Sequence, residues 1–219
     1  MSSQLVPPIG ERLRAERSRR GVSVRGLARD IGVSASLISQ IETGKSSPSV
    51  STLYAMTTAL GISVEDIFTD PNSEESTAAE RDRRSGDGYP PVGPHHALHT
   101  QRKRRIGPVV HTHQREMLTL DSGVTWELLG QLPDTHVDFL LITYAPGGSS
   151  SSSSGLLMRH SGTEYGYVLS GELTLTLGFE KHRLTAGDAV SFDSTTPHGY
   201  RNDGVEPAVG VWFVLERSG

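Results

Sequence analysis

The hydrophobic pattern changes period once along the chain, and this change restricts the possible folds more than any other feature. In residues 9–68 apolar residues recur at helical spacing, as in residues 24–31 (VRGLARDI). In residues 139–215 they run continuously or alternate, as in residues 172–177 (ELTLTL). Residues 70–107 are rich in Pro, Gly, Ser and charge, and have no apolar period, which predicts a flexible linker. We therefore predict two domains, residues 1–69 and residues 108–219, which are joined by a flexible linker, residues 70–107.

Charge is distributed unevenly between these parts. The overall net charge of −4 alone argues against a nucleic-acid partner. However, residues 1–107 carry 15 Lys and Arg against 12 Asp and Glu, a net +3, whereas residues 108–219 carry 6 against 13, a net −7. This asymmetry indicates two modules with different partners.

The composition excludes several classes of protein. No run of about eighteen apolar residues is present, so no membrane span is expected. The N-terminal residues lack the apolar core of a signal peptide. The chain has no cysteine, which excludes disulfides and thiolate metal sites. Together these features predict a cytoplasmic protein.

Residues 9–68 carry start and stop signals for short helices. Ser23 and Ser34 precede apolar-periodic segments, and a serine oxygen there can accept a hydrogen bond from a free N–H of the first turn. Gly44 and Gly61 follow such segments and can adopt the left-handed conformation that ends a helix. Residues 63–66 (SVED) are typical of a capping box before a last short helix.

Residues 108–219 read as short strands separated by turns, which predicts a sandwich or barrel. Phe139–Tyr144 is continuously apolar, and we expect a strand buried on both faces. Glu172–Leu177 alternates strictly, and we expect one face in water. Val209–Leu215 is expected to be the last strand, and the serine run Ser149–Ser154 a flexible loop.

Residues 23–44 (SVRGLARDIGVSASLISQIETG) resemble the phage-repressor type of helix-turn-helix found in XRE-family regulators. The family pattern continues through residues 9–68. The resemblance implies a five-helix, repressor-like domain and a recognition helix, Ser34–Thr43, that lies in the major groove of double-stranded DNA. The other interpretation is a helical interaction domain that binds no DNA.

The resemblance also implies which side chains contact DNA. Gln40 can form a bidentate contact with adenine, and Ala35 offers only an apolar contact. The family often has Gln where Val24 stands, so the phosphate contact is expected from Arg25 instead. Arg17 and Glu42 occupy the positions of a structural ion pair. The predicted DNA-binding residues are Arg25, Ser34, Ala35, Ser36, Ser39, Gln40, Lys45 and Ser46.

Residues 160–171 (HSGTEYGYVLSG) resemble the first motif of the cupin family. His160, Glu164 and Gly171 fit its second histidine, its glutamate and its last glycine, but Met158 stands where its first histidine would be. Residues 198–202 (HGYRN) resemble the end of the second cupin motif. The resemblance implies a C-terminal cupin barrel, a jelly roll built from a double-stranded β-helix.

Three side chains of these two motifs are candidate metal ligands. A thioether is a poor ligand for hard divalent ions, so the candidate ligands are His160, Glu164 and His198. Two histidines and one carboxylate suit non-haem Fe(II), and Mn or Zn would also fit. The alternative is a pocket lined by the same residues, hydrogen-bonded to one another and without a metal.

We therefore expect a transcriptional regulator, not an enzyme, in which the cupin domain binds a small-molecule effector. A homodimer through the cupin barrels would bind two DNA half-sites. Because the predicted linker is long, effector binding is expected to reach the DNA-binding domains through the dimer interface. The rival interpretation is an iron oxidoreductase, because the same domain order and ligand set occur in the hydroxypropylphosphonate epoxidase family. A cupin isomerase or dioxygenase would leave the helical domain unexplained.

Overall fold

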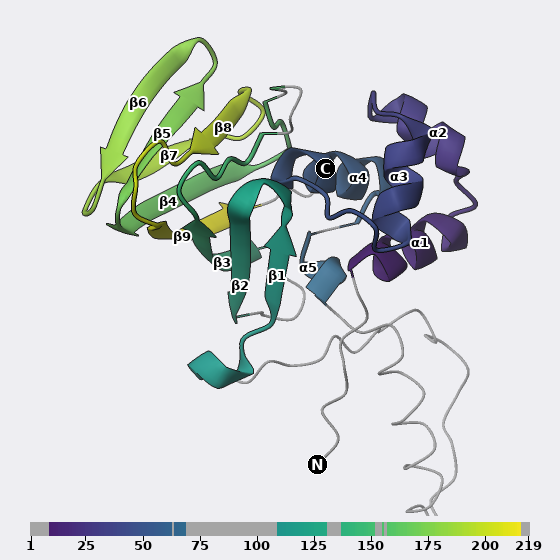
Figure 1. Ribbon diagram of the computed structural model, residues 1–219, viewed down its shortest axis with the longest axis horizontal. Coiled ribbons are helices and arrows are strands. Elements are labelled where there is room, and N and C mark those ends of the chain that lie inside the picture. The colour runs from purple at the N-terminus through teal and green to yellow at the C-terminus, as the bar shows by residue number, and fades with distance from the viewer. Residues whose placement is uncertain are drawn as a thin grey trace, which may run out of the picture.

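The computed structural model describes residues 9–62, 64–68, 109–130, 137–151, 155 and 157–215, and consists of a helical domain beside a β barrel (Figure 1). The predicted two-domain α + β organisation is confirmed. The expected linker, residues 70–107, lies outside the described residues, as does Ser63 of the expected capping box. The helices are α1 (Ile9–Arg19), α2 (Val24–Asp30), α3 (Ala35–Glu42), α4 (Val50–Leu60) and α5 (Val64–Phe68).

The expected helix caps are present in the helical domain. Ser23 Oγ accepts from the Gly26 N–H at 3.0 Å, and Ser34 Oγ accepts from the Leu37 N–H at 3.1 Å. Gly61 ends α4 in the left-handed conformation, with φ 60°. α1–α4 have 7 to 11 residues, whereas α5 is a segment of only five, so the fifth helix is reduced to little more than one turn.

Two contacts hold α1 against α3. Arg17 pairs with the buried Glu42, with Nε–Oε1 at 2.5 Å and Nη2–Oε2 at 2.9 Å, and also donates to the Val22 carbonyl at 2.7 Å. The hydrogen bond to Glu42 raises the pKa of Arg17 against the opposing effect of burial. Gly10 lies so close to α3 that a Cβ there would be 1.9 Å from the Ile41 carbonyl oxygen. The crossing of α1 and α3 therefore depends on a residue without a side chain.

We predict that Gly10→Ala destabilises the helical domain by about 1–3 kcal/mol, because the new methyl group must displace the backbone of α3. Chemical denaturation followed by far-ultraviolet circular dichroism measures this loss. Ser18→Ala introduces the same residue at an exposed position of α1 and should change stability by less than about 0.5 kcal/mol. Equal stability of the two variants would contradict the close approach of α1 and α3.

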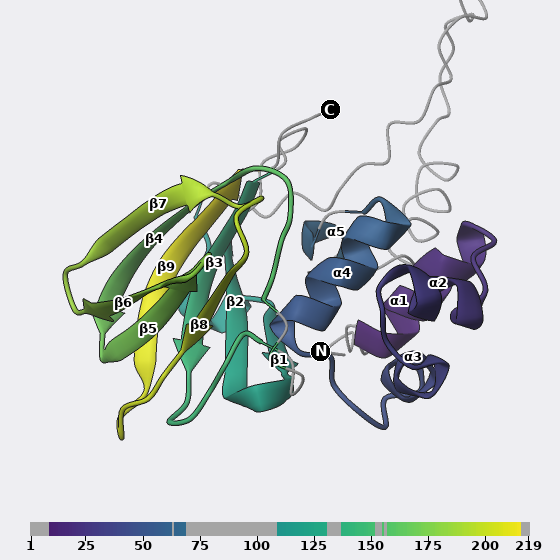
Figure 2. The ribbon, with the colours of Figure 1, turned by 90° about the horizontal axis from the view of Figure 1, so that it is seen from above.

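The barrel consists of two antiparallel sheets that face each other (Figure 2). One sheet has six strands in the order β1-β2-β3-β9-β4-β7, and the other has three in the order β6-β5-β8. Two short 3-10 turns, η2 (Thr112–Gln114) and η3 (Asp121–Gly123), flank the first strand. The strands are β1 (Met117–Leu120), β2 (Val124–Gly130), β3 (Val137–Tyr144), β4 (Thr163–Ser170), β5 (Glu172–Leu177), β6 (Glu180–Thr185), β7 (Ala189–Asp193), β8 (His198–Arg201) and β9 (Ala208–Leu215).

Burial along β3 differs from the prediction for Phe139–Tyr144. We expected both faces of this strand to be buried, but burial alternates along it. Leu140 and Ile142 point into the barrel, whereas Phe139 and Leu141 are only half-buried on the outer face. The outer apolar residues pack sideways on the neighbouring strand instead, and Phe139 stacks on Phe213 with ring centroids 4.3 Å apart. The prediction of burial on both faces is therefore wrong.

The two domains pack directly against each other through α4. This helix lies between the barrel and the helices α1 to α3 (Figures 1 and 2). Two main-chain hydrogen bonds join the domains at its start, from Asp121 N–H to the Pro48 carbonyl at 2.9 Å and from Ser51 N–H to the Ser150 carbonyl at 3.0 Å. Most of the helix is buried because of this position, and only Thr58 and Ala59 near its end are exposed. Its buried residues are Val50, Ser51, Thr52, Leu53, Tyr54, Met56, Thr57 and Leu60.

Among the described residues, no helix has the length and apolar character that crossing a bilayer requires.

Candidate metal site and DNA-binding surface

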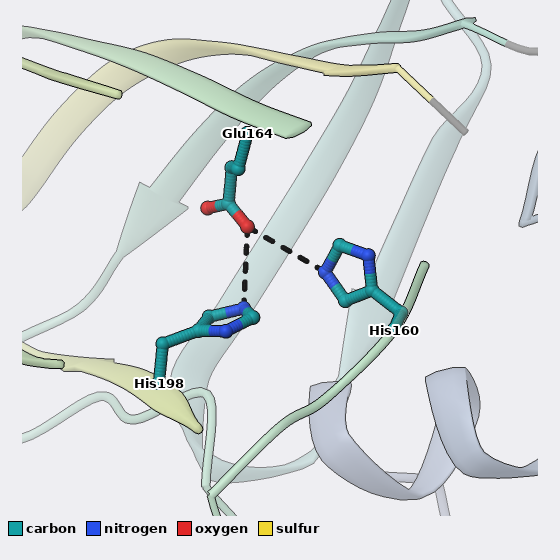
Figure 3. A group of neighbouring side chains, drawn as sticks. All are labelled: His160, Glu164 and His198. Carbon is teal, nitrogen blue, oxygen red and sulfur yellow. Dashed lines mark ion pairs between the residues drawn. The ribbon is translucent and has the colours of Figure 1, made fainter. Parts of the chain in front are cut away.

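The three predicted metal ligands meet inside the barrel. His160 precedes β4, Glu164 lies in β4, and His198 begins β8; all three side chains are buried. Glu164 Oε2 lies 3.5 Å from His160 Nε2 and 3.2 Å from His198 Nε2, and points between the two imidazoles (Figure 3). One ligand atom from each of the three residues lies within 4.8 Å of the others. The structure thus brings together residues that are up to 38 positions apart in the chain.

Both histidines are oriented by their Nδ1 atoms. His198 Nδ1 lies 2.8 Å from the Thr196 carbonyl, and His160 Nδ1 lies 3.4 Å from the Ser161 carbonyl. A carbonyl can only accept, so the proton of each neutral ring is assigned to Nδ1, and Nε2 carries a lone pair. Ligating histidines are commonly held in this way.

The donor set fits a cation. Among the described residues, neither buried Nε2 atom has a hydrogen-bond partner. Two lone pairs and a carboxylate oxygen therefore converge in a buried site, which is unfavourable unless a positive charge lies between them. Ligand atoms bound at about 2.1 Å to one ion are roughly 3.0–3.4 Å apart in octahedral or tetrahedral geometry. The two Nε2–Oε2 distances are close to this separation.

Glu164 is held as an ionised carboxylate. Burial raises its pKa, but the neighbouring imidazoles of His160 and His198 outweigh burial and lower the pKa to about 2. Tyr200 donates its hydroxyl to Glu164 Oε1 at 2.8 Å, which leaves Oε2 for the site. Burial, and then the Glu164 charge, raise the pKa of Tyr200, so this phenol stays protonated and keeps donating.

Trp212 supports Tyr200 from β9, which belongs to the opposite sheet. Its indole Nε1–H donates to the Tyr200 hydroxyl at 3.2 Å. Two glycines make room for the indole, because a Cβ at Gly166 would lie 2.8 Å from it and a Cβ at Gly210 would lie 2.3 Å from it. Tyr200 lines the site, whereas Tyr165 and Tyr167 are exposed on the outer face of the barrel.

Two further residues of the cupin-like motifs shape the chain and do not join the metal ligands. Asn202 donates through Nδ2 to the Tyr144 carbonyl at 3.0 Å and the Glu206 carbonyl at 2.8 Å, which anchors the loop before β9. Gly171 has φ 74° and lies against the backbone of Pro207, where a side chain would collide. Buried Met158 pairs with His198 through main-chain hydrogen bonds of 2.8 and 3.0 Å.

Sequence analysis missed Tyr54, which reaches the site from the helical domain. The Tyr54 ring stacks on the His160 imidazole, with ring centroids 4.4 Å apart and an angle of 8° between the planes. Tyr54 also makes an edge-on contact with Trp126 of β2, with ring centroids 5.7 Å apart. In the sequence, Tyr54 reads as one more residue of an apolar helix, so only the packing of the domains reveals its contact with a candidate ligand.

The predicted DNA-binding residues gather on the surface around α3. Its inner face carries Ile38 and Ile41, which are buried, and its outer face carries Ser36, Ser39 and Gln40, which are exposed. α2 and α3 lie on the side of α4 away from the barrel (Figures 1 and 2). Arg25, Ser34 and Lys45 are also exposed, whereas Ala35 and Ser46 are half-buried.

Comparison with known families agrees with this geometry. Residues 8–67 match the family described as Helix-turn-helix domain, and residues 140–214 match the family described as Cupin domain. The chain is a helix-turn-helix protein with a C-terminal cupin domain. The resemblance to XRE-family regulators with a cupin domain is thereby confirmed.

Relatives of this helix-turn-helix and cupin protein share both domains. HTH-type transcriptional regulator PuuR of Escherichia coli strain K12 is 28% identical over 204 residues, covering 92% of this chain and 91% of the relative. HTH-type transcriptional regulator SutR of the same strain is 25% identical over 192 residues, covering 88% and 85%. The crystal structure of an HTH_3 family transcriptional regulator from Vibrio cholerae has the same fold, with a TM-score of 0.61, 23% identity and 96% of each chain covered.

We predict that His160→Ala and His198→Ala each abolish stoichiometric binding of Fe(II), Mn(II) or Zn(II), because two ligands do not hold an ion in a cavity built for three. Elemental analysis of the purified protein and calorimetric titration measure this loss. His182→Ala, an exposed histidine of β6, is the matched control and should leave metal binding unchanged. Equal metal content in all variants would contradict the assignment of the site.

Proposed function

We propose that this chain is a sequence-specific, DNA-binding transcriptional regulator whose cupin domain senses a small molecule. The observation that carries this proposal is the two-faced helix α3, which buries Ile38 and Ile41 and exposes a row of short polar side chains. The two relatives PuuR and SutR, which extend over both domains, are named as transcriptional regulators. Such a regulator would act in the cytoplasm, where bacterial DNA is accessible.

The arrangement of α3 suits docking in the major groove. Ser34 caps the first turn by accepting from the Leu37 N–H, and this end of the helix carries the positive end of the helix dipole. Gln40 offers both a donor and an acceptor to an adenine edge. Arg25 of α2 and Lys45, which follows α3, are both exposed and would contact phosphates, which position the helix without reading sequence.

We predict that Gln40→Ala reduces discrimination between the preferred duplex and single-base variants by about 1–3 kcal/mol at the position it reads. Lys45→Ala should instead weaken binding to all duplexes alike. It should also lower the slope of log affinity against log salt concentration by about one, which corresponds to one phosphate contact. Selection from a random pool of duplexes, followed by affinity measurements at several salt concentrations, tests both.

Lys181→Ala is the matched control, because it removes the same charge from β6 of the cupin barrel. It should leave DNA affinity nearly unchanged. If the wild-type chain prefers no sequence at moderate salt, the proposed regulator function is wrong.

We further propose that His160, Glu164 and His198 hold one divalent metal, with Fe, Mn and Zn as the candidates. The supporting observation is the convergence of two Nε2 atoms without hydrogen-bond partners among the described residues on one carboxylate oxygen. A metal bound by three protein ligands keeps open positions, at which it would act as a Lewis acid for oxygen atoms of an effector. Tyr200 would keep the Glu164 carboxylate turned towards that ion.

The same three ligands also favour a second candidate function, an iron-dependent oxidoreductase similar to the hydroxypropylphosphonate epoxidases. Two histidines and one carboxylate are the ligand set of many non-haem Fe(II) oxygenases. The exposed polar face of α3 favours the regulator, because an enzyme that uses the helical domain as a scaffold has no need of it. Oxygen consumption by the iron-loaded protein with a hydroxyalkyl phosphonate would favour the enzyme.

We propose that the protein forms a homodimer through the outer face of the six-stranded sheet. This outer patch carries large exposed apolar residues on two neighbouring strands, β4 and β9, and exposed patches of this kind mark interaction surfaces. A two-fold dimer would present two copies of α3 to two half-sites of DNA. The residues of the outer patch are Tyr165, Tyr167, Leu169, Phe213 and Leu215, which are 39–49% exposed.

We predict that Phe213→Asp converts the dimer to a monomer, because a carboxylate at the centre of the outer patch cannot be desolvated in an apolar interface. A loss of at least about 2 kcal/mol is typical of a central aromatic anchor. Analytical ultracentrifugation over a range of concentrations measures it. Phe179→Asp alters a fully exposed phenylalanine between β5 and β6 and should leave the dimer intact; a monomeric wild type would refute the interface.

A further inference from the structure

Tyr54 is a residue of the DNA-binding domain that forms part of the wall of the metal site. Tyr54 belongs to α4 of the helical domain, and its side chain is only 5% exposed. Its ring covers one face of the His160 imidazole at 4.4 Å, nearly parallel to it. A candidate metal ligand in one domain therefore has its ring plane in contact with an aromatic ring of the other domain.

A second connection joins α4 to the other side of the same site. The Ser51 N–H donates to the Ser150 carbonyl at 3.0 Å, and Ser150 Oγ accepts from the Tyr200 N–H at 2.8 Å. Tyr200 is the residue whose hydroxyl holds Glu164. The start of α4 is thus linked to His160 through a ring stack and to Glu164 through a short chain of hydrogen bonds.

The same helix belongs to the core of the helical domain. Leu53 and Met56 of α4 are buried in that core, and α4 packs on α1 and α2. Cores are close-packed, so α4 cannot shift without moving the helices around it. Any change in how α4 sits on the barrel therefore changes the position of α3 relative to the barrel.

Metal binding restricts the ring on which Tyr54 stacks. An imidazole binds a metal through the Nε2 lone pair, which lies in the plane of the ring, so the ion and its other ligands fix that plane. A parallel stack at 4.4 Å requires the Tyr54 ring to match the same plane. An occupied site consequently favours the packed position of α4, whereas without the ion the His160 ring is held less tightly.

We propose that the Tyr54–His160 stack couples the metal site to the DNA-binding domain, so that metal binding and duplex binding change each other's affinity. This inference rests on the proposed function of the two domains. Coupling of this kind is reciprocal, so the factor by which metal changes the dissociation constant for DNA equals the factor by which DNA changes that for metal.

The test compares Tyr54→Leu with Phe192→Leu in the full-length chain. Phe192 of β7 is the matched control, because it makes an edge contact with the other histidine, His198, at 5.0 Å but belongs to the cupin barrel itself. The duplex is the one selected from the random pool, and the metal is Mn(II), added or removed with a chelator. Circular dichroism first establishes that each variant is folded.

In the wild type, Mn(II) is expected to change the dissociation constant for the duplex by about fivefold or more, which is the lower range of measured allosteric coupling. The change should be retained in Phe192→Leu and in Tyr54→Phe, which keeps the ring, and should fall within about twofold in Tyr54→Leu. A metal effect of equal size in the wild type and Tyr54→Leu would overturn the proposal, as would a wild type that binds no metal.

Hydrogen exchange supplies a readout that needs no DNA. Mn(II) should slow exchange of the amides in residues 49–57 of the wild type and of Phe192→Leu, but not of Tyr54→Leu. If the wild type prefers no duplex, the proposed regulator function fails, and exchange alone then decides whether the site and α4 are coupled. If Mn(II) leaves amide exchange in residues 49–57 of the wild type unchanged, the coupling is refuted, whether or not Tyr54→Leu folds.

Discussion

The burial of the Glu164 carboxylate is the constraint on which the arrangement of the barrel interior depends. A charge removed from water must be compensated inside the protein. Here a phenol donates to one carboxylate oxygen, and the Nε2 atoms of two imidazoles face the other, where a cation would complete the compensation. The phenol is in turn supported by the Trp212 indole, and the indole fits because Gly166 and Gly210 carry no side chain. The strands β4, β8 and β9 are thus tied together around one charge.

The sequence predicted local structure well, and it also identified three side chains that meet inside the barrel. Serine caps and left-handed glycines follow from backbone chemistry that involves only a few neighbouring residues, as Ser23, Ser34 and Gly61 illustrate. His160, Glu164 and His198 could be found because their residue types and spacing match a known motif. The spacing of a motif does not predict which carbonyl orients each imidazole. The two Nδ1 contacts became visible only in the structure.

Features that depend on packing between distant parts of the chain could not be predicted. In the run Phe139–Tyr144 only Thr143 marks the outer face as polar, so hydrophobicity suggested burial on both sides. Tyr54 stands among apolar residues that serve the helical core, and nothing local distinguishes the ring that faces the other domain. The expectation that an effector acts through the dimer interface followed from linker length, which says nothing about direct contact between the domains.

The hydrogen bonds from Asp121 to Pro48 and from Ser51 to Ser150 are made entirely by main-chain atoms. Substitution of the side chains at these four positions therefore leaves their donors and acceptors in place, except where proline would replace a donor. The mutual orientation of the two domains can in this way outlast extensive sequence divergence. The ring contact beside them, in contrast, depends on a single side chain, so protein engineering can vary communication between the domains without undoing their attachment.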